Sequence, residues 1–230
     1  MQRTFLQSII VILALASCSR TQDKSKEKAV VEFNQDLVDE LSSMAETDQI
    51  AARNAYPPED YQHLDLEQWK DFKDSIYRTH KTRLAEIFEE YGYPGFDLVG
   101  KTGEKHFWLM VQHADFDPEF QSDVLKDLES EVKNNNADGR NFGLLTDRVR
   151  LNTGKKQIYG TQVTYISKTG QAIPKPLMDS IKVNKRRKEV GLEPIEEYLN
   201  VMTTMHFEMN KENMLKRGIV EPKLYQLPSE

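Results

Sequence analysis

Three side chains that can carry out acid–base chemistry follow the apolar run 107–111, and these are His113, Asp115 and Asp117. An imidazole accepts or donates protons near neutral pH, and a neighbouring carboxylate can fix its orientation. This spacing suggests a hydrolase-type enzyme in which His113 is a general base oriented by Asp115. A structural hydrogen bond is the alternative for His113, and Asp117 before Pro118 has the pattern of a helix cap.

The His-x-Asp-x-Asp pattern also contains ligand types suited to a hard or borderline metal ion. Short His and Asp spacings often arise by chance, and the capping role already accounts for Asp117. The chain has a single cysteine, which excludes a zinc site built on several thiolates and a thioredoxin-like redox pair. It also lacks GxSxG, HExxH and phosphate-loop motifs. We therefore predict no metal site, and the cofactor, if any, is unknown.

Arg148 is a charged residue on the apolar side of the predicted helix 141–152. At about 100° per residue, Arg148 lies within an arc of apolar positions, and Asp147 lies just outside it. The arc consists of Phe142, Leu144, Leu145, Val149 and Leu151. An unpaired buried charge is very costly, so we expect a buried carboxylate partner for Arg148, either Asp48 or Asp115. Such a polar centre would serve a ligand or a reaction in which Arg148 stabilises negative charge, or it would only fix helix register.

The stretch QIYGTQV, residues 157–163, is the second candidate region. Read as a strand, it gathers hydrogen-bonding side chains around Gly160, namely Gln157, Tyr159, Thr161 and Gln162. A glycine inside a strand often marks a bulge or a close approach by another backbone or a ligand. We therefore regard these four residues as candidate ligand-binding groups, with an exposed polar hairpin as the alternative.

Apolar residues recur at three- and four-residue steps along most of the chain, which predicts amphipathic helices. Asp48 falls on the apolar stripe of the first helix, where another hydrophobic residue is expected. Period-two alternation occurs around 157–166, and Gly170 favours a hairpin turn after it. The predicted helices cover 33–53, 66–91, about 104–113, 118–133, 141–152, about 179–190 and 194–215, and the hairpin covers 157–174.

The predicted fold class is therefore α+β and mainly α, with a single helical domain at 31–217, one small β-hairpin and an extended tail at 218–230. The basic run 185–188 precedes a predicted helix end at Gly191-Leu192. Cations near the carboxyl end of a helix complement its dipole, and this accounts for the run.

The first 17 residues have the features of an export signal rather than of a folded element. Arg3 precedes a short apolar segment at 9–16, which is too short to span a bilayer as a helix. The tetrad Leu15-Ala16-Ser17-Cys18 resembles the bacterial lipobox, in which a signal peptidase cuts just before a cysteine that is then lipidated. We predict a lipoprotein signal peptide at 1–17 and lipidation of Cys18, with an ordinary secretory signal as the alternative.

Residues 18–30 contain the lipidated Cys18 and a polar, charged segment, which predicts a flexible tether between the membrane and the domain. Ser19 stands where many lipoproteins retained at the inner membrane have an aspartate. By that resemblance we expect a lipid-anchored protein of the bacterial cell envelope, with the outer membrane favoured. Whether it faces the periplasm or the cell exterior is not encoded in these residues.

Charge excludes one class of partner. The chain has 31 Lys and Arg residues against 37 Asp and Glu, a formal net charge of −6 at pH 7. Binding to nucleic acid needs clustered cations that neutralise phosphates, so we expect no nucleic-acid partner. The expected partners are the membrane, through the lipid anchor, and an unknown polar ligand or envelope protein.

Four motifs in this order carry a resemblance to a known family. They are WLMVQHADFDPEFQ, the step Asp147-Arg148-Val149, QIYGTQ and RRKEVGLEPIEEY, and together they resemble the bacterial family catalogued as domain of unknown function 6624. The similarity runs from Asp48-Gln49 and Arg53 through Gly92-Tyr93-Pro94 to Tyr198. The resemblance implies no activity, because the family has none assigned. It does single out His113, Asp115, Asp147, Arg148, Gln157, Tyr159, Gly160 and Gln162, with Asp48 and Arg53 as possible charge partners.

Three functions remain open on these observations. The first is a lipid-anchored module that binds a polar ligand in a pocket lined by His, Asp, Arg and Gln. The second is a hydrolase-type enzyme that uses His113 as general base. The third is a structural or interaction lipoprotein whose buried charges only specify packing. A closed, fully paired cluster would favour the third, and an open one would favour the first two.

Overall fold

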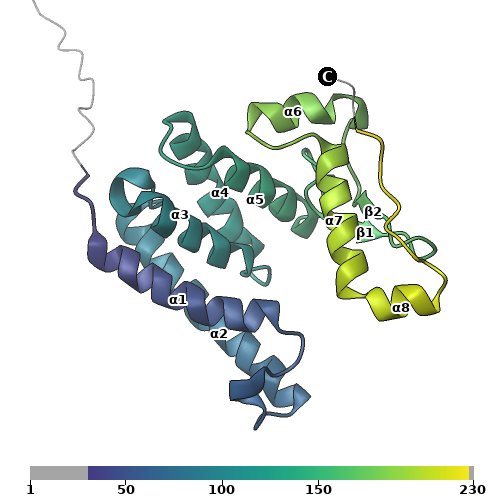
Figure 1. Ribbon diagram of the computed structural model, residues 1–230. Coiled ribbons are helices and arrows are strands. Elements are labelled where there is room, and N and C mark those ends of the chain that lie inside the picture. The colour runs from purple at the N-terminus through teal and green to yellow at the C-terminus, as the bar shows by residue number, and fades with distance from the viewer. Residues whose placement is uncertain (1–30, 228–230) are drawn as a thin grey trace, which may run out of the picture. The chain divides into compact units, whose positions relative to one another are not determined.

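The computed structural model describes residues 31–227, and these form eight α-helices and one two-stranded hairpin (Figure 1). The predicted signal peptide at 1–17, the tether at 18–30 and the last residues, 228–230, lie outside the described range. The fold is α+β and mainly α, as predicted. The helices are α1 (Gln35–Arg53), α2 (Leu66–Tyr91), α3 (Phe96–Gln112), α4 (Pro118–Lys133), α5 (Gly139–Asn152), α6 (Val183–Glu189), α7 (Ile195–Met209) and α8 (Lys211–Lys216), and the strands are β1 (Val163–Tyr165) and β2 (Ala172–Pro174).

Side-chain caps set the beginning of four of the longer helices. Asn34, Asp65, Asp117 and Asp138 each accept a hydrogen bond from a backbone N–H in the first turn of α1, α2, α4 and α5. The cap predicted at Asp117 is thereby confirmed. At its carboxyl end α2 stops at Gly92, whose φ of 70° is a conformation that glycine adopts without steric cost.

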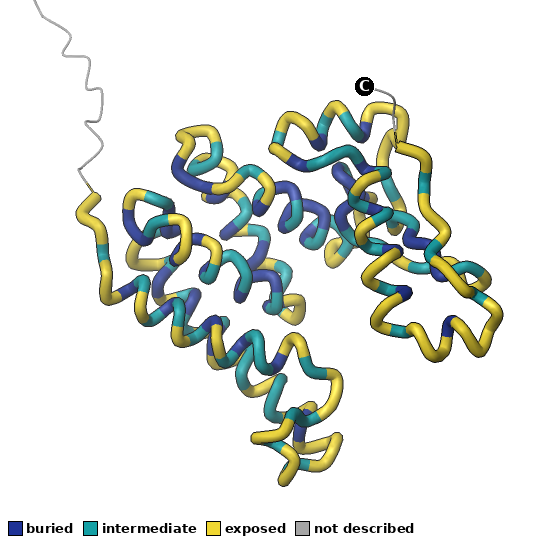
Figure 2. Tube along the Cα trace, viewed as in Figure 1, coloured by how far each residue is buried: buried dark blue, intermediate teal, exposed yellow. Residues whose placement is uncertain are grey.

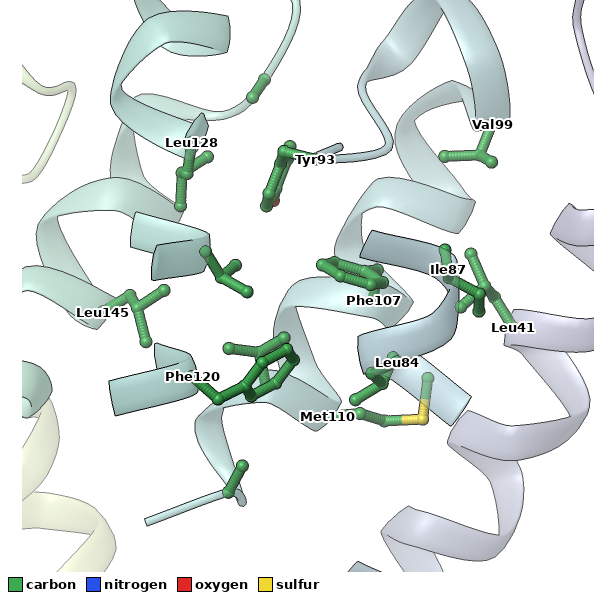
Figure 3. Packing of buried hydrophobic residues seen from close by; sticks show 14 of the residues in the cluster. Leu41, Leu84, Ile87, Tyr93, Val99, Phe107, Met110, Phe120, Leu128 and Leu145 are labelled. Carbon is green, nitrogen blue, oxygen red and sulfur yellow. The ribbon is translucent and has the colours of Figure 1, made fainter. Parts of the chain in front are cut away.

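The five helices from α1 to α5 together form the main hydrophobic core (Figure 3). Each of these five helices contributes at least one side chain that is fully shielded from solvent, and examples are Leu41, Leu84, Phe107, Leu128 and Leu145. Burial follows one face of each helix, as the alternation of buried and exposed positions in Figure 2 shows. This is the arrangement that three- and four-residue periodicity predicts.

Helices α1 and α3 run side by side in the same direction with a nearly constant offset. The backbone N–H of Asn34 donates to the carbonyl of Leu98, at the start of both helices. Further along, Ser42 lies 3.2 Å from His106, and the residues of this pair are 64 positions apart in the chain. At the carboxyl ends of the helices, Asp48 and the residue that follows α3 are 65 positions apart. The register of this helix pair therefore decides which side chains meet at its carboxyl end.

A second, smaller core lies between the hairpin and helices α6 and α7. Its buried members are Ala172, Val183, Ile195 and Leu199. Strands β1 and β2 pair antiparallel, with Thr164 opposite Ile173. Helix α6 ends as predicted, because the N–H of Leu192 donates to the carbonyl of Arg187 across Gly191, which has a φ of 75°.

Four predicted elements differ from those observed. The helix predicted at about 179–190 is shorter, and α6 begins at Val183 after a 3₁₀ turn at Ser180–Lys182. Helix α3 begins at Phe96 rather than near residue 104, because it continues through a kink at Gly100, where φ is 63°. The strand predicted over 157–166 is reduced to β1, since most of the preceding residues form an irregular loop held by side chains. The last predicted helix is divided into α7 and α8 at Asn210, whose side chain hydrogen-bonds the carbonyl of His206 and so competes with the helix.

Candidate functional site

A fully buried carboxylate holds the imidazole at the carboxyl end of α3. Asp48 on α1 is 0% exposed, and its two oxygens lie 2.8 and 3.0 Å from Nδ1 of His113. A carboxylate can only accept a hydrogen bond, so in the neutral ring Nδ1 must carry the proton. The second ring nitrogen, Nε2, is then left as an acceptor. Asp48 and His113 meet because α1 and α3 run in the same direction with the nearly constant offset described above.

The same carboxylate faces a second histidine, which the sequence reading did not identify. Nδ1 of His80, on α2, lies 3.8 Å from an oxygen of Asp48. Burial by itself raises the pKa of Asp48, but the hydrogen bond from His113 and the nearby ring of His80 outweigh it and lower that pKa below its ordinary value. Asp48 is therefore ionised at neutral pH. The position of His80, between Ile76 and Leu84 on the buried stripe of α2, was the signal that could have found it.

The side chain of His113 is partly open to solvent. It is 22% exposed, and the ring of Tyr77 packs against it with the centroids 5.2 Å apart. Burial and the charge of Asp48 raise the pKa of Tyr77, so this phenol keeps its proton at neutral pH. The hydrogen bond that orients the His113 ring comes from Asp48, so the prediction that Asp115 orients this ring is wrong.

Arg148 and Asp115 form a second cluster that is attached to the same end of α3. Nη1 of Arg148 donates to Asp115 at 2.6 Å, and Nε donates to the side-chain oxygen of Gln112 at 2.9 Å. The other oxygen of Asp115 accepts hydrogen bonds from Gln121 and Asn152. Gln112 and Asp115 flank His113 in the chain, so the Arg148 cluster is fixed to the segment that also positions the imidazole.

The partner of Arg148 is thus one of the two predicted, but the pair is not buried. The side chain of Arg148 is 25% exposed and that of Asp115 is 49% exposed. A long arginine side chain can cover apolar surface with its methylene groups and still carry its charged head to solvent. This explains how Arg148 occupies the apolar side of α5 without a buried charge.

The buried charge of α5 is the adjacent residue, Asp147, which the helical wheel placed just outside the apolar arc. Asp147 is 0% exposed. One of its oxygens accepts the backbone N–H of Ile158 at 2.7 Å, and the other accepts that of Thr161 at 2.9 Å. The backbone N–H of Tyr159 and the hydroxyl of Thr161 donate to it as well. A buried carboxylate is tolerated there because this loop supplies so many donors.

Most of the candidate residues in 157–162 brace this loop from inside. The side-chain amide of Gln157 donates to the carbonyl of Gln162 and accepts from its N–H, which closes a small ring. Gly160 has a φ of 73°, and a Cβ at this position would lie 2.7 Å from Ile195. The predicted approach of a backbone or a ligand at this glycine is therefore wrong in its partner, because the approaching group is a side chain of α7. The alternative of an exposed hairpin is wrong, since Gln157, Tyr159 and Thr161 are buried.

Arg187 completes this closed region and corrects the interpretation of the basic run 185–188. It is 0% exposed, and it donates to the carbonyls of Tyr159 at 2.7 Å and Glu193 at 2.6 Å. Burial lowers its pKa, and its guanidinium lies 5.0 Å from the ring centroid of Tyr198. Its spacing from the buried Val183, four residues earlier on α6, was the available sequence signal.

Arg53, predicted as a charge partner, reaches the Asp48 carboxylate only through an amide. Its Nε donates to the side-chain oxygen of Gln49 at 3.0 Å, and Nε2 of Gln49 donates to Asp48 at 3.1 Å. Arg53, Gln49, Asp48 and His113 therefore form one chain of hydrogen bonds across α1 and α3.

The larger cavities among the described residues include one of about 790 Å³ and one of about 570 Å³. Neither of these two is lined by His113, Asp115 or Arg148. Within residues 31–227 no group of three or more His, Cys, Asp or Glu side chains is arranged to hold a metal ion. In the same range no helix combines the length and apolar character needed to cross a membrane.

Fold and site together define a mainly helical α+β domain with one closed and one partly open polar cluster. A family described as a family of unknown function, DUF6624, matches residues 35–208, from the start of α1 almost to the end of α7. The chain belongs to this family. No curated protein and no solved structure shows a significant match.

Proposed function

We propose that this chain is a lipid-anchored protein of the bacterial cell envelope that binds a polar ligand at the carboxyl end of α3. The observation that carries the proposal is the contact between Asp48 and His113. It fixes the ring through Nδ1 and leaves Nε2 as an acceptor on a partly exposed side chain. Arg148, one quarter exposed, adds a cation beside the same segment.

Gln112 gives further support to a ligand at this end of α3. Its side-chain oxygen is occupied by Arg148, whereas its Nε2 is buried and has no hydrogen-bond partner among residues 31–227. Buried donors are nearly always satisfied, so this amide is a spare donor close to the exposed cluster. Imidazole, guanidinium and amide together suit a ligand with several oxygen acceptors and a hydroxyl or amine donor.

A hydrolase-type reaction is the second candidate, and the same contact favours it. With the Nδ1 proton held by Asp48, Nε2 can take a proton from a water molecule or a hydroxyl group of the ligand. The carboxylate would stabilise the imidazolium that forms, and Arg148 would stabilise negative charge on the ligand. The neutral Tyr77 beside the ring would act as a hydrogen-bond donor.

The test compares His113→Gln with His63→Gln, a control at an exposed loop position. Glutamine can keep a hydrogen bond to Asp48 through its amide N–H, but it has no basic ring nitrogen in the position of Nε2. Each variant is incubated with a small-molecule extract of bacterial envelopes, and bound compounds are identified by mass spectrometry after gel filtration. We expect the parent and His63→Gln to retain a compound that His113→Gln does not. Equal retention by all three proteins would contradict the proposal.

Binding and turnover are separated by the fate of the retained compound. A binder returns it unchanged, whereas an enzyme releases a product that disappears in both His113→Gln and Asp48→Asn. Loss of product with unchanged retention of substrate in Asp48→Asn would favour the enzyme. Unchanged compound in the parent after prolonged incubation would favour the binding module.

The anchor is tested separately with Cys18→Ser and Ser19→Asp. We expect Cys18→Ser to remain unlipidated, and either to leave the detergent-soluble membrane fraction or to stay unprocessed. Ser19→Asp should stay lipidated and move from the outer to the inner membrane. Membrane fractionation of Cys18→Ser like that of the parent would contradict the lipid anchor, and an unchanged address of Ser19→Asp would contradict outer-membrane targeting.

A further inference from the structure

A cavity of about 570 Å³ lies along the groove between α1 and α3, and among the side chains of the site described above only Gln49 and Arg53 line it. Its volume falls within the range of about 300–1,000 Å³ that is usual for small-molecule sites. The polar side chains in its wall are Ser42, Glu46, Gln49 and Arg53 of α1, Asn54 directly after it, and Lys105 and His106 of α3. Of the four candidate motifs, none points to this groove.

The charge of the cavity wall favours an anion. Arg53 and Lys105 are cations, and Glu46 is the one carboxylate among its lining residues. Nε of Arg53 binds Gln49, but within the described residues neither its two Nη atoms nor the ammonium group of Lys105 has an ion-pair partner. A guanidinium with two free N–H groups can bind a carboxylate or a phosphate in a bidentate manner.

The other end of the groove offers a neutral acceptor. The hydroxyl of Ser42 donates its one hydrogen to the carbonyl of Val38 at 2.8 Å, so it can only accept from Nδ1 of His106, 3.2 Å away. Burial, and then the charge of Lys105, lower the pKa of His106, which keeps the ring neutral near pH 7. Its Nε2 is therefore an acceptor for a hydroxyl or amine donor of the ligand.

Gln49 connects this cavity to the imidazole of the proposed site. It accepts from Arg53 at 3.0 Å and donates to Asp48 at 3.1 Å, and Asp48 in turn holds His113 at 2.8 Å. An anion that pulls the guanidinium of Arg53 toward the cavity removes the donor from which Gln49 accepts a hydrogen bond. The amide then changes the hydrogen bonding of the carboxylate that orients His113.

We propose that the groove between α1 and α3 binds a small organic anion, and that the guanidinium of Arg53 makes the main contact with the carboxylate or phosphate of this anion. Gln49 then transmits the binding of the anion to His113. The proposal deepens the function proposed above and rests on it for the role of His113. It assigns a chemical class to the ligand, an organic acid or a phosphate ester that also has a hydrogen-bond donor for His106.

The experiment is a titration of the folded domain with sodium phosphate and, separately, with sodium acetate, at constant ionic strength maintained with sodium chloride. The readouts are the side-chain amide signal of Gln49 and the ring signals of His106 and His113 in NMR spectra. We expect saturable shifts of Gln49 and His113 with at least one anion. Shifts with phosphate but not with acetate would indicate a phosphate ester as the natural ligand. Shifts with acetate but not with phosphate would indicate a carboxylic acid.

Arg53→Met is the decisive variant, and Arg78→Met is its control on α2 outside the cavity. Losing a charge-assisted bidentate contact should weaken anion binding by about tenfold or more in Arg53→Met and leave Arg78→Met unchanged. Lys105→Met should weaken it less, because an ammonium group makes no bidentate contact with a carboxylate or a phosphate. Absence of saturable shifts with both anions, or equal shifts in Arg53→Met, would overturn the proposal.

Gln49→Leu tests the connection to His113. We expect it to keep the response of His106 to a bound anion and to lose the response of His113. A parent protein in which the anion binds at Arg53 and His113 does not respond would overturn the coupling. If this response is present but His113→Gln still retains envelope-derived compounds, the function proposed for His113 fails and the anion site stands.

Discussion

Two neighbouring residues of α5 lead to polar regions of opposite character. Asp147 points to the loop 157–161, where its carboxylate is shielded from solvent and surrounded by backbone donors. Arg148 points to the end of α3, where its charge and that of Asp115 remain partly exposed. Successive residues of a helix differ by about 100° in direction, which is enough to separate the two regions.

The difference shows which cluster stabilises the fold and which cluster presents groups that can bind a ligand or react. The closed region, made of Asp147, Gln157, Thr161 and Arg187, directs its groups mainly toward one another and toward backbone. The open region has the partly exposed ring of His113 and an exposed edge of Asp115. Buried polar groups without an exposed face can specify packing, whereas a ligand needs groups that it can reach.

The largest expected effect is that of breaking the closed region at Asp147. Asp147→Ala leaves the N–H groups of Ile158, Tyr159 and Thr161 buried without an acceptor. We expect the free energy of unfolding to fall by about 3–5 kcal/mol. Urea denaturation measures it, with the exposed Asp123→Ala on α4 as a control that should change stability by less than about 0.5 kcal/mol. A loss below about 1 kcal/mol for Asp147→Ala would remove the distinction between the two regions.

An intermediate effect is expected at Asp48, and it should depend on pH. The folded-state pKa of Asp48 lies below its ordinary value of 3.8, so its ionised form stabilises the fold above about pH 4. This contribution is lost as the pH falls through the folded-state pKa. Asp48→Asn should therefore be less stable than the parent by about 2 kcal/mol at pH 7, as expected for hydrogen bonds to a charged group, and nearly equal to it at low pH. Urea denaturation as a function of pH checks this, and a difference that grows toward low pH would have the wrong sign.

The smallest effect on stability is expected at Arg148. A half-exposed ion pair contributes about 0–1 kcal/mol, in contrast to the 3–5 kcal/mol expected if the pair were buried. Arg148→Met should accordingly unfold at nearly the same urea concentration as the parent while it retains less of the envelope-derived ligand. A double-mutant cycle with Asp115→Asn should give a coupling energy below about 1 kcal/mol. A loss of several kcal/mol would place Arg148 in the structural cluster.

The sequence predicted the helices well because their signals are local. Periodicity located α2 with both of its ends, and the capping pattern located the start of α4 at Pro118. The short strand β1 was overestimated, since the loop before it owes its shape to hydrogen bonds with Asp147, and period-two alternation does not reveal a contact with the preceding helix α5.

The candidate site was predicted in its residue types and not in its pairing. His113, Asp115 and Arg148 do lie at one end of α3, but the partner of His113 is Asp48, 65 residues earlier in the chain. That pairing depends on the parallel register of α1 and α3, which no local pattern encodes. The helical wheel likewise predicted a buried charge at Arg148, whereas the buried charge is Asp147. A wheel gives the direction of each residue and takes no account of the length of an arginine side chain.

The central claim is that Asp48 holds His113 through Nδ1 and leaves Nε2 available, and the tautomer of this ring tests it most directly. Long-range ¹H–¹⁵N NMR spectra of the ¹⁵N-labelled domain, recorded where the ring is neutral, distinguish a protonated from an unprotonated ring nitrogen. Exposed His63 in the same spectrum is the reference. We predict that His113 carries its proton on Nδ1 and that Asp48→Ala abolishes this preference. A proton on Nε2 in the parent protein would contradict the account.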